Sequence, residues 1–141
     1  MEQSEIEVHG SWLKEKEPTV VLIKLYFKGG FYMEVLYEVR GENLFIYLPE
    51  ELDHHNSKMI TEQSDWYIVS NQIRNIIFNF KNTNFMDSSG IGVIMGRYKL
   101  IKTRGGNITV TNINNAIDRI LTISGLYKIV NKKEMINLAE F

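Results

Sequence analysis

The chain has 141 residues and a mass of 16.4 kDa, enough for one ordinary domain. Hydrophobic residues make up 44% and charged residues 23%, so the chain can bury a core and is not wholly disordered. Its net charge of -1 argues against electrostatic binding of nucleic acid. The absence of cysteine excludes disulfides, thiolate catalysis and cysteine-ligated metal sites within this chain.

No segment predicts a membrane span or an export signal. The longest apolar run, Thr19 to Phe27, is interrupted by Lys24 and is less than half of the roughly 20 residues that a span requires. The segment before it has its first basic residue only at Lys14, and no small-residue cleavage site follows the run. We therefore expect a soluble cytoplasmic protein that contacts neither membrane nor nucleic acid.

The pattern of apolar residues predicts an α/β fold. In residues 33–40, apolar and polar residues alternate with a period of two, which predicts a strand, and a turn signal follows at 41–43. Residues 44–48 predict a second strand, so the two strands are expected to form a hairpin. After Pro49, strands and helices alternate, which predicts a mainly parallel sheet with an antiparallel N-terminal hairpin and about four helices. The later predicted elements are a helix over 53–73 capped by Asp53 or Asn56, a strand over 75–80, a polar loop over 81–87, a helix over 88–103 stopped by Gly105-Gly106, a strand over 107–111, a helix from Asn114 or Asn115 to Ile123, a short strand over 127–130 and a helix over 133–141.

The stretch Asn82 to Gly92 is the most informative part of the sequence. It follows a strand of the buried type and opens an amphipathic helix, so it lies at the carboxyl end of a parallel strand, where ligands and partners usually dock. The simplest interpretation is a helix cap, in which Asp87 or Ser88 accepts a hydrogen bond from the first-turn amides.

Two catalytic or cofactor motifs are not matched in this stretch. A nucleophile elbow needs glycine two positions before the serine, and Met86 occupies that place before Ser88. Gly90, Gly92 and Gly96 are spaced one residue too widely for a dinucleotide-binding fingerprint. No cofactor is therefore expected.

The second polar cluster contains the adjacent histidines His54 and His55. Neighbouring residues point about 100° apart on a helix, or to opposite faces of a strand, so the pair does not readily bind one metal ion. A catalytic triad can be assembled from Ser88, His54 and Asp53, but no oxyanion-hole motif accompanies it. We expect a solvated helix entrance, with no metal site and no catalytic residue.

Three motifs resemble the anti-sigma factor antagonist family, whose members are STAS domains. They are Glu51-Leu52-Asp53-His54-His55, the long run from Phe85 to Lys99, and Ser124-Gly125-Leu126-Tyr127-Lys128-Ile129. They occur in the order and at the spacing of the family, and the resemblance covers residues 33–141. It is strongest to the sporulation branch, whose members antagonise the anti-sigma-F factor.

The resemblance implies a phosphorylation switch. In that family the first serine of Asp-Ser-Ser-Gly is phosphorylated by the anti-sigma factor, which is itself a serine kinase, and the matching residue here is Ser88. The unphosphorylated antagonist binds the kinase and releases the sigma factor, phosphorylation ends the binding, and a serine phosphatase restores it. The chain would then be a regulator and not an enzyme.

The resemblance also implies which residues meet the partner. Asp87 and Ser89 would shape the loop around the switch, and two glycines would let the partner approach the helix start. The expected partner-binding residues are Asp53, His54, Asp87, Ser88, Ser89, Gly90 and Gly92. Glu50 stands where the family usually has glycine. This difference affects the geometry of the turn, and therefore the positions of Asp53 and His54.

Two other functions stay open. One is an antagonist of the same fold that serves a general-stress sigma factor, and the choice between the branches rests on His54-His55 and on Gly96-Arg97-Tyr98-Lys99. The other is a small serine hydrolase that uses Ser88 with His54.

Residues 1–32 differ in character from the rest of the chain. Members of the family begin near Met33, and the codons of Lys28-Gly29-Gly30 can spell a purine-rich ribosome-binding sequence at a suitable distance before it. We therefore predict a STAS domain over 33–141 and an N-terminal extension over 1–32 that is a translated leader. The alternative is a genuine extension that adds an edge strand over Thr19 to Phe27.

Overall fold

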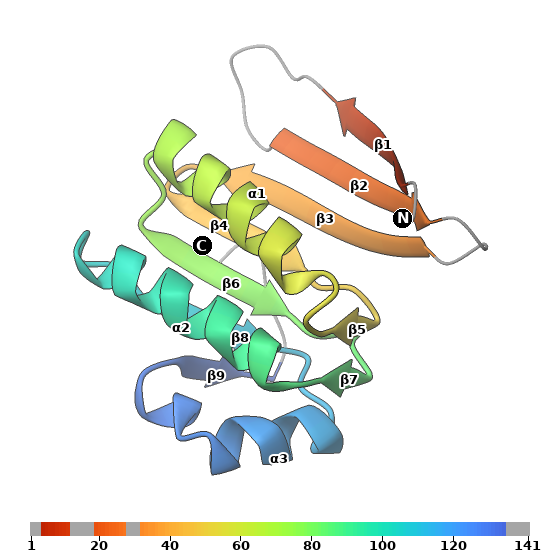
Figure 1. Ribbon diagram of the computed structural model, residues 1–141. Helices are drawn as coiled ribbons and strands as arrows, with labels where there is room; N and C mark the ends of the chain where they lie inside the picture. Colours follow the sequence, from red (N-terminus) through yellow and green to blue (C-terminus); the bar gives the residue numbers. More distant parts are fainter. Residues whose placement is uncertain (1–3, 12–18, 28–31, 135–141) are drawn as a thin grey trace.

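Seven strands form one mixed sheet in the order β1-β2-β3-β4-β6-β8-β9 (Figure 1). The computed structural model describes residues 4–11, 19–27 and 32–134. Strands β1 to β4 pair antiparallel, and β4, β6, β8 and β9 pair parallel, which confirms the predicted mixed sheet. The strands are β1 (Ser4–Ser11), β2 (Thr19–Phe27), β3 (Tyr32–Arg40), β4 (Asn43–Tyr47), β6 (Asn75–Asn79), β8 (Ile108–Thr111) and β9 (Asn131–Lys133).

Three α-helices lie in the described part of the chain, and α1 and α2 run side by side over one face of the sheet (Figure 1). They are α1 (Ser57–Ser70), α2 (Ser88–Lys102) and α3 (Asn115–Ile123). The core between helices and sheet consists of fully buried apolar side chains, among them Leu44, Ile46, Ile76 and Phe78. The predicted helix over 133–141 lies mostly outside the described residues, and its first residue ends β9.

The predicted strand over 127–130 is wrong. Residues Leu126–Lys128 form a short 3-10 helix, η1, and the strand begins only at Asn131. Gly125 enters η1 with φ of +78°, a left-handed conformation that glycine adopts freely. The Val130 amide donates to the Leu126 carbonyl, and this helical spacing turns both side chains into the core. A short apolar run does not distinguish this turn from a strand.

A second, smaller sheet was not predicted. It consists of the two-residue parallel strands β5 (Glu51–Leu52) and β7 (Phe85–Met86), and β7 lies inside the segment predicted as a polar loop. Because β5 occupies residues 51–52 and a turn follows it, α1 begins at Ser57 and not at Asp53. This small sheet brings the two predicted polar clusters together.

The run over residues 19–27 is a strand, as the alternative for the N-terminal segment required. It is not an edge strand, because β1 pairs with its outer side along eight residues. Whether translation begins at Met33 is a separate matter, and that prediction stays a prediction.

Candidate functional site

The site is built on the register of the small sheet. Glu51 pairs with Phe85, and Leu52 pairs with Met86. Leu52 and Met86 point into the core, with 0% and 2% of their surface exposed, while Glu51 and Phe85 are exposed. Since side chains alternate along a strand, the next residue on each strand faces outward again.

The residues that follow the two strands are Asp53 and Asp87. The Asp87 amide donates to the Leu52 carbonyl at 3.2 Å, so the pairing of the two segments continues beyond the strands. Two carboxylates from distant parts of the sequence therefore come to lie on one surface. Both residues could be singled out from the sequence, but their alignment by a parallel register could not.

Asp87 is the N-cap of α2. Its Oδ1 accepts a hydrogen bond from the Ser89 amide at 2.8 Å, and its carbonyl oxygen accepts one from the Gly90 amide at 3.0 Å. Of the two predicted caps, the structure therefore selects Asp87 over Ser88. Partial burial would raise the pKa of Asp87, but hydrogen bonds from the backbone amides of Ser89 and His54 outweigh it and hold the pKa below its usual value.

The turn between β5 and α1 is held by its own side chains. Asp53 Oδ1 accepts from the His55 amide at 2.9 Å, and the Asp53 carbonyl accepts from the Ser57 amide at 2.9 Å. Asn56, the N-cap residue of α1, donates through Nδ2 to the Glu51 carbonyl and accepts the Asp53 amide on Oδ1 at 3.0 Å. The position of Asp53 is thus fixed by the backbone around it.

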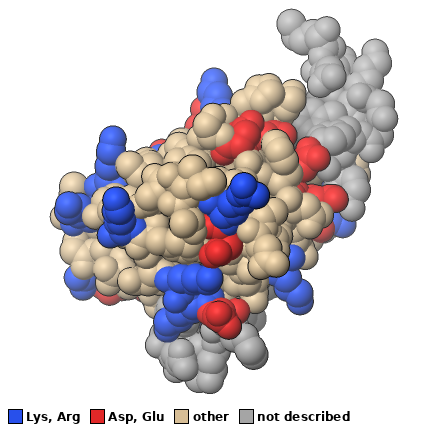
Figure 2. Space-filling model, turned by 90° about the horizontal axis from the view of Figure 1, so that it is seen from below, with Lys and Arg blue, Asp and Glu red and all other residues tan. Residues whose placement is uncertain are grey.

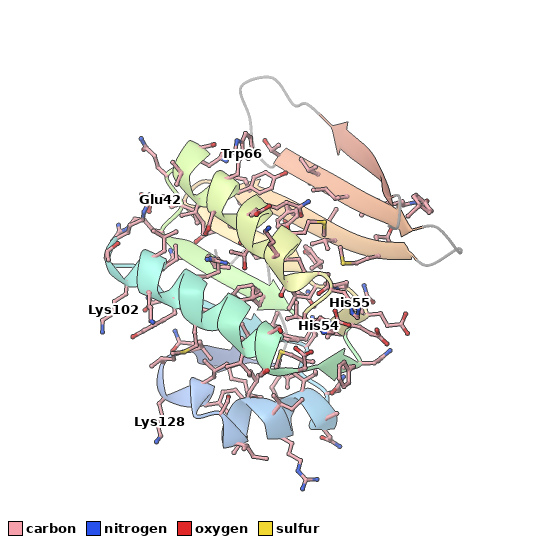
Figure 3. The ribbon with its side chains drawn as sticks, viewed as in Figure 1. Glu42, His54, His55, Trp66, Lys102 and Lys128 are labelled. Carbon is pink, nitrogen blue, oxygen red and sulfur yellow. The ribbon has the colours of Figure 1, made fainter. Side chains whose placement is uncertain are left out.

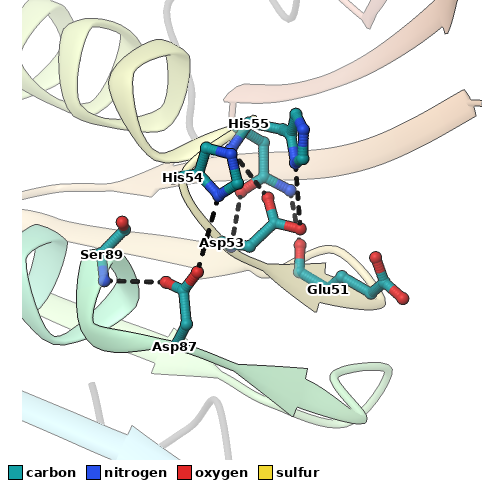
Figure 4. Close-up of polar contacts among 7 residues, drawn as sticks. Glu51, Asp53, His54, His55, Asp87 and Ser89 are labelled. Atoms are coloured by element: carbon teal, nitrogen blue, oxygen red, sulfur yellow. Dashed lines mark hydrogen bonds and ion pairs between the residues drawn. The ribbon is translucent and has the colours of Figure 1, made fainter.

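The two histidines pair with different carboxylates (Figure 4). His54 Nδ1 lies 3.8 Å from Asp87 Oδ2, and His55 Nδ1 lies 3.6 Å from Asp53 Oδ2. Their rings are in contact, with centroids 3.9 Å apart. This arrangement is not the triad considered from the sequence, because Asp53 pairs with His55 and His54 pairs with Asp87.

Ser88 is the first residue of α2 and is exposed. Among the described residues, no hydrogen-bond partner is found for its hydroxyl. The neighbouring Ser89 is only partly exposed, and its amide donates to Asp87 Oδ1 at 2.8 Å. Of the two serines at the start of α2, Ser88 is therefore the more exposed.

The two glycines in the first turns of α2 have different surroundings. Gly90 is buried, and a Cβ at this position would lie 2.8 Å from Met86 Sδ and 3.0 Å from Leu52 Cγ. Gly92 is exposed, with open space around the position of a Cβ. Gly90 therefore has an internal packing role, and of these two glycines only Gly92 offers space on the surface.

A polar recess of about 620 Å³ borders the site on the side of β5. Glu50, Asp53, Lys81 and Asn84 are among the residues that line it. The Glu50 carbonyl accepts the amides of Asn84 at 2.8 Å and Phe85 at 3.3 Å, so the residue that replaces the family's usual glycine contributes to the pairing of β5 and β7.

The charges of the molecule are unevenly distributed. Figure 3 places Lys102 and Lys128 at the end opposite His54 and His55. Seen from below, several lysines and arginines lie on the side where α2 finishes, and others lie across the middle of this face (Figure 2). The site end carries exposed carboxylates, including Glu51, together with the exposed Lys81.

Among the described residues, no group of three or more histidine, aspartate or glutamate side chains is arranged to hold a metal ion. No helix in that part of the chain combines the length and apolar composition needed to cross a membrane. The features that the structure shows at this end are hydrogen bonds, charged side chains and the exposed Ser88.

Comparison with known proteins identifies the family. The STAS domain family matches residues 34–139. The chain belongs to the STAS domain family. An anti-sigma F factor antagonist of Paenibacillus polymyxa is 48% identical to this STAS domain over 87 residues, 62% of this chain and 74% of that protein. An anti-sigma F factor antagonist of Lysinibacillus sphaericus is 32% identical over 88 residues, 62% and 75% of the two chains.

Solved structures show the same fold. The anti-sigma factor antagonist SpoIIAA in its unphosphorylated form aligns with a TM-score of 0.62 and 26% identity, over 72% of this chain and 89% of that one. The Bacillus cell fate determinant SpoIIAA in the phosphorylated form aligns with a TM-score of 0.59 and 30% identity, over 70% and 90%. The predicted STAS fold is confirmed.

Proposed function

We propose that this STAS domain is an anti-sigma factor antagonist of the sporulation sigma-F type. The unphosphorylated chain binds an anti-sigma factor that is a serine kinase, and the bound sigma factor is released. The kinase inactivates the chain by phosphorylating Ser88, and a serine phosphatase acting on phosphorylated Ser88 restores it. The similarity to the Paenibacillus and Lysinibacillus anti-sigma F factor antagonists supports this proposal.

In this proposal the chain acts in the cytoplasm as a binding module. It has no catalytic activity or cofactor of its own, and the nucleotide in the complex belongs to the kinase. The contact surface combines the start of α2 with the turn after β5, and includes Asp53, His54, Asp87, Ser88, Ser89 and Gly92.

The state of the Ser88 hydroxyl is the observation that carries the proposal. A kinase must reach its target hydroxyl, and Ser88 is exposed at the end of a helix without a hydrogen-bond partner among the described residues. Ser89 is only partly exposed, so Ser88 is the more accessible of the two serines. A relative whose structure is known in a phosphorylated form adds support.

The physical effect of the phosphate falls on the complex and not on the fold. A phosphoryl group adds about -1.5 to -2 charges. At an exposed helix N-terminus an anion gains roughly 0.3–1 kcal/mol, although Asp87 already occupies the Ser89 amide here. Burying an unpaired dianion against a partner costs several kcal/mol, which corresponds to orders of magnitude in affinity.

Two substitutions at the same position test the proposal. Ser88→Asp places a carboxylate where the phosphate would be, and we expect the variant to fold normally and to bind the anti-sigma factor about 100-fold more weakly. Ser88→Ala is the matched control, and we expect it to bind like the wild type but to resist phosphorylation. Tight binding by Ser88→Asp would contradict the mechanism.

The general-stress function remains the second candidate. An anti-sigma-B factor antagonist of Bacillus subtilis is 35% identical over 51 residues, 36% of this chain and 47% of that protein. Titration of the chain with an anti-sigma-F and an anti-sigma-B factor separates the two, and we expect tighter binding to the first. A labelled fluorophosphonate tests the hydrolase alternative, and we expect no reaction at Ser88.

A further inference from the structure

Phe85 is a large aromatic side chain left half exposed beside the switch serine. It is 51% exposed, whereas Met86, next to it on β7, is 2% exposed. Among the described residues, the large apolar side chains with more than half of their surface exposed are Trp66, Val69, Phe85 and Ile123. Of these, Phe85 belongs to the strand that leads directly into Asp87 and Ser88.

We propose that Phe85 is the apolar anchor through which this surface docks on the anti-sigma kinase. The inference rests on the proposed function and adds to it a residue that carries binding energy. Exposed aromatic side chains cost little while free in solution, but contribute strongly when a partner buries them.

The neighbours of Phe85 follow from the register of the small sheet. Glu51 is its partner across the pair, and Asp53 and Asp87 follow on the same outward side of β5 and β7. Phe85 is therefore one apolar side chain bordered by three carboxylates. We call these four residues the β7 patch.

The chemistry of the patch defines its partner. An interface of this kind buries an apolar centre and surrounds it with charged groups that determine orientation and partner choice. The complement of the β7 patch is an apolar recess on the kinase with lysine or arginine side chains at its rim. Lys102 and Lys128 of this chain lie at the end opposite His54 and His55, so they do not supply these basic groups to the patch of the same molecule (Figure 3).

Trp66 provides the matched control. It is 62% exposed on the outer side of α1, and Figure 3 shows it away from His54 and His55. It lies nine residues beyond the start of the helix at Ser57, which is about 14 Å along the helix axis. Its truncation removes a comparable exposed aromatic surface without touching the β7 patch.

The test measures affinity of the full chain for the anti-sigma factor kinase of the same organism by isothermal titration calorimetry. We expect Phe85→Ala to weaken binding about tenfold or more, and Trp66→Ala to change it less than twofold. Phe85→Leu, which keeps an apolar side chain, should recover part of the loss. Circular dichroism and thermal unfolding establish whether each variant is folded. If Phe85→Ala does not fold, the affinity of Phe85→Leu is compared with that of the wild type instead.

The outcomes separate the two proposals. If Phe85→Ala reduces the affinity for the kinase at least three times more than Trp66→Ala does, the inference is supported. Any smaller difference between the two variants overturns it. If the wild-type chain does not bind the kinase at all, the proposed function itself fails. If the wild type binds and the Phe85 variants bind equally well, only the role of Phe85 is wrong.

Discussion

The Asp87 carboxylate joins the start of α2 to the turn where His54 lies. Its Oδ1 accepts the Ser89 amide at 2.8 Å, and its Oδ2 lies 3.8 Å from His54 Nδ1. Asp87 and His54 are far apart in the sequence, and they meet because β5 and β7 pair in a parallel register. The geometry around Ser88 thus depends on two strands of two residues each.

Removing the Asp87 side chain should destabilise the protein in a pH-dependent way. Asp87→Ala removes the cap of α2 and should cost about 1 kcal/mol at pH 7. Because the pKa of Asp87 is lowered in the folded state, its ionised form stabilises the fold above the unfolded-state pKa of about 3.9. That contribution is lost as the pH falls through the lower, folded-state pKa.

Urea unfolding of wild type and Asp87→Ala at pH 7 and at about pH 3 measures this effect. We expect the difference in the free energy of unfolding to narrow at the lower pH. Asp87→Asn is the control, because asparagine is also a good N-cap and should cost little at pH 7. An equal loss from Asp87→Ala at both pH values would argue against the role of its charge.

The two glycines of the helix start should respond oppositely to alanine. Gly90→Ala forces a methyl group against Met86 and Leu52 in the core, and should destabilise by roughly 1–3 kcal/mol. Gly92→Ala meets open space within a helix and should stabilise by roughly 0.5–1 kcal/mol. Thermal and urea unfolding report both changes. Similar effects at the two positions would contradict the packing described for Gly90.

The ion pair between α1 and α2 should matter more than an exposed one. Arg97 Nε lies 2.9 Å from Asp65 Oδ1, and only 8% of the Arg97 side chain is exposed. Burial lowers the pKa of Arg97, although the Asp65 charge opposes the shift. Asp65→Ala leaves a buried guanidinium without its counter-charge, and we expect a loss of roughly 1–3 kcal/mol in the free energy of unfolding.

The control for this pair is Glu42→Ala. Glu42 lies 3.8 Å from Arg74 in a pair whose side chains are both largely exposed. Such pairs contribute at most about 1 kcal/mol, so its removal should be nearly neutral. If Glu42→Ala lowered the free energy of unfolding as much as Asp65→Ala does, burial of Arg97 would not explain the effect of Asp65→Ala.

The prediction that translation begins at Met33 has a direct measurement. Mass spectrometry of the N-terminal peptide from native cells should find a protein that starts at Met33. Recovery of a peptide that includes Met1 or Glu2 would overturn the leader interpretation and would make β1 and β2 part of the natural sheet.

Long elements could be predicted from the sequence because their signals are repeated. The alternation before Gly41 and the turn at that residue, whose φ is +57°, predicted the hairpin of β3 and β4. Helix α2 follows from apolar spacing and ends before Gly105, whose φ of +73° fits the left-handed conformation expected after a helix.

Short elements and contacts between distant residues could not be predicted. Two-residue strands such as β5 and β7 contain no periodicity, so the segment before Asp87 looked like a polar loop. The residues of the candidate site were identified by their resemblance to a family. The pairing of His54 with Asp87, the burial of Gly90 and the exposure of Phe85 depend on that small sheet and needed the structure.

We propose that one hydroxyl, that of Ser88 at the start of α2, controls binding to the anti-sigma kinase. The most direct measurement incubates the chain with its anti-sigma kinase and ATP, maps the modified residue by mass spectrometry, and measures the affinity of the modified form for the same kinase. We expect a single phosphate on Ser88, an unchanged far-UV circular dichroism spectrum and binding weakened by about 100-fold. Phosphate on another residue, or undiminished binding by the form phosphorylated at Ser88, would contradict it.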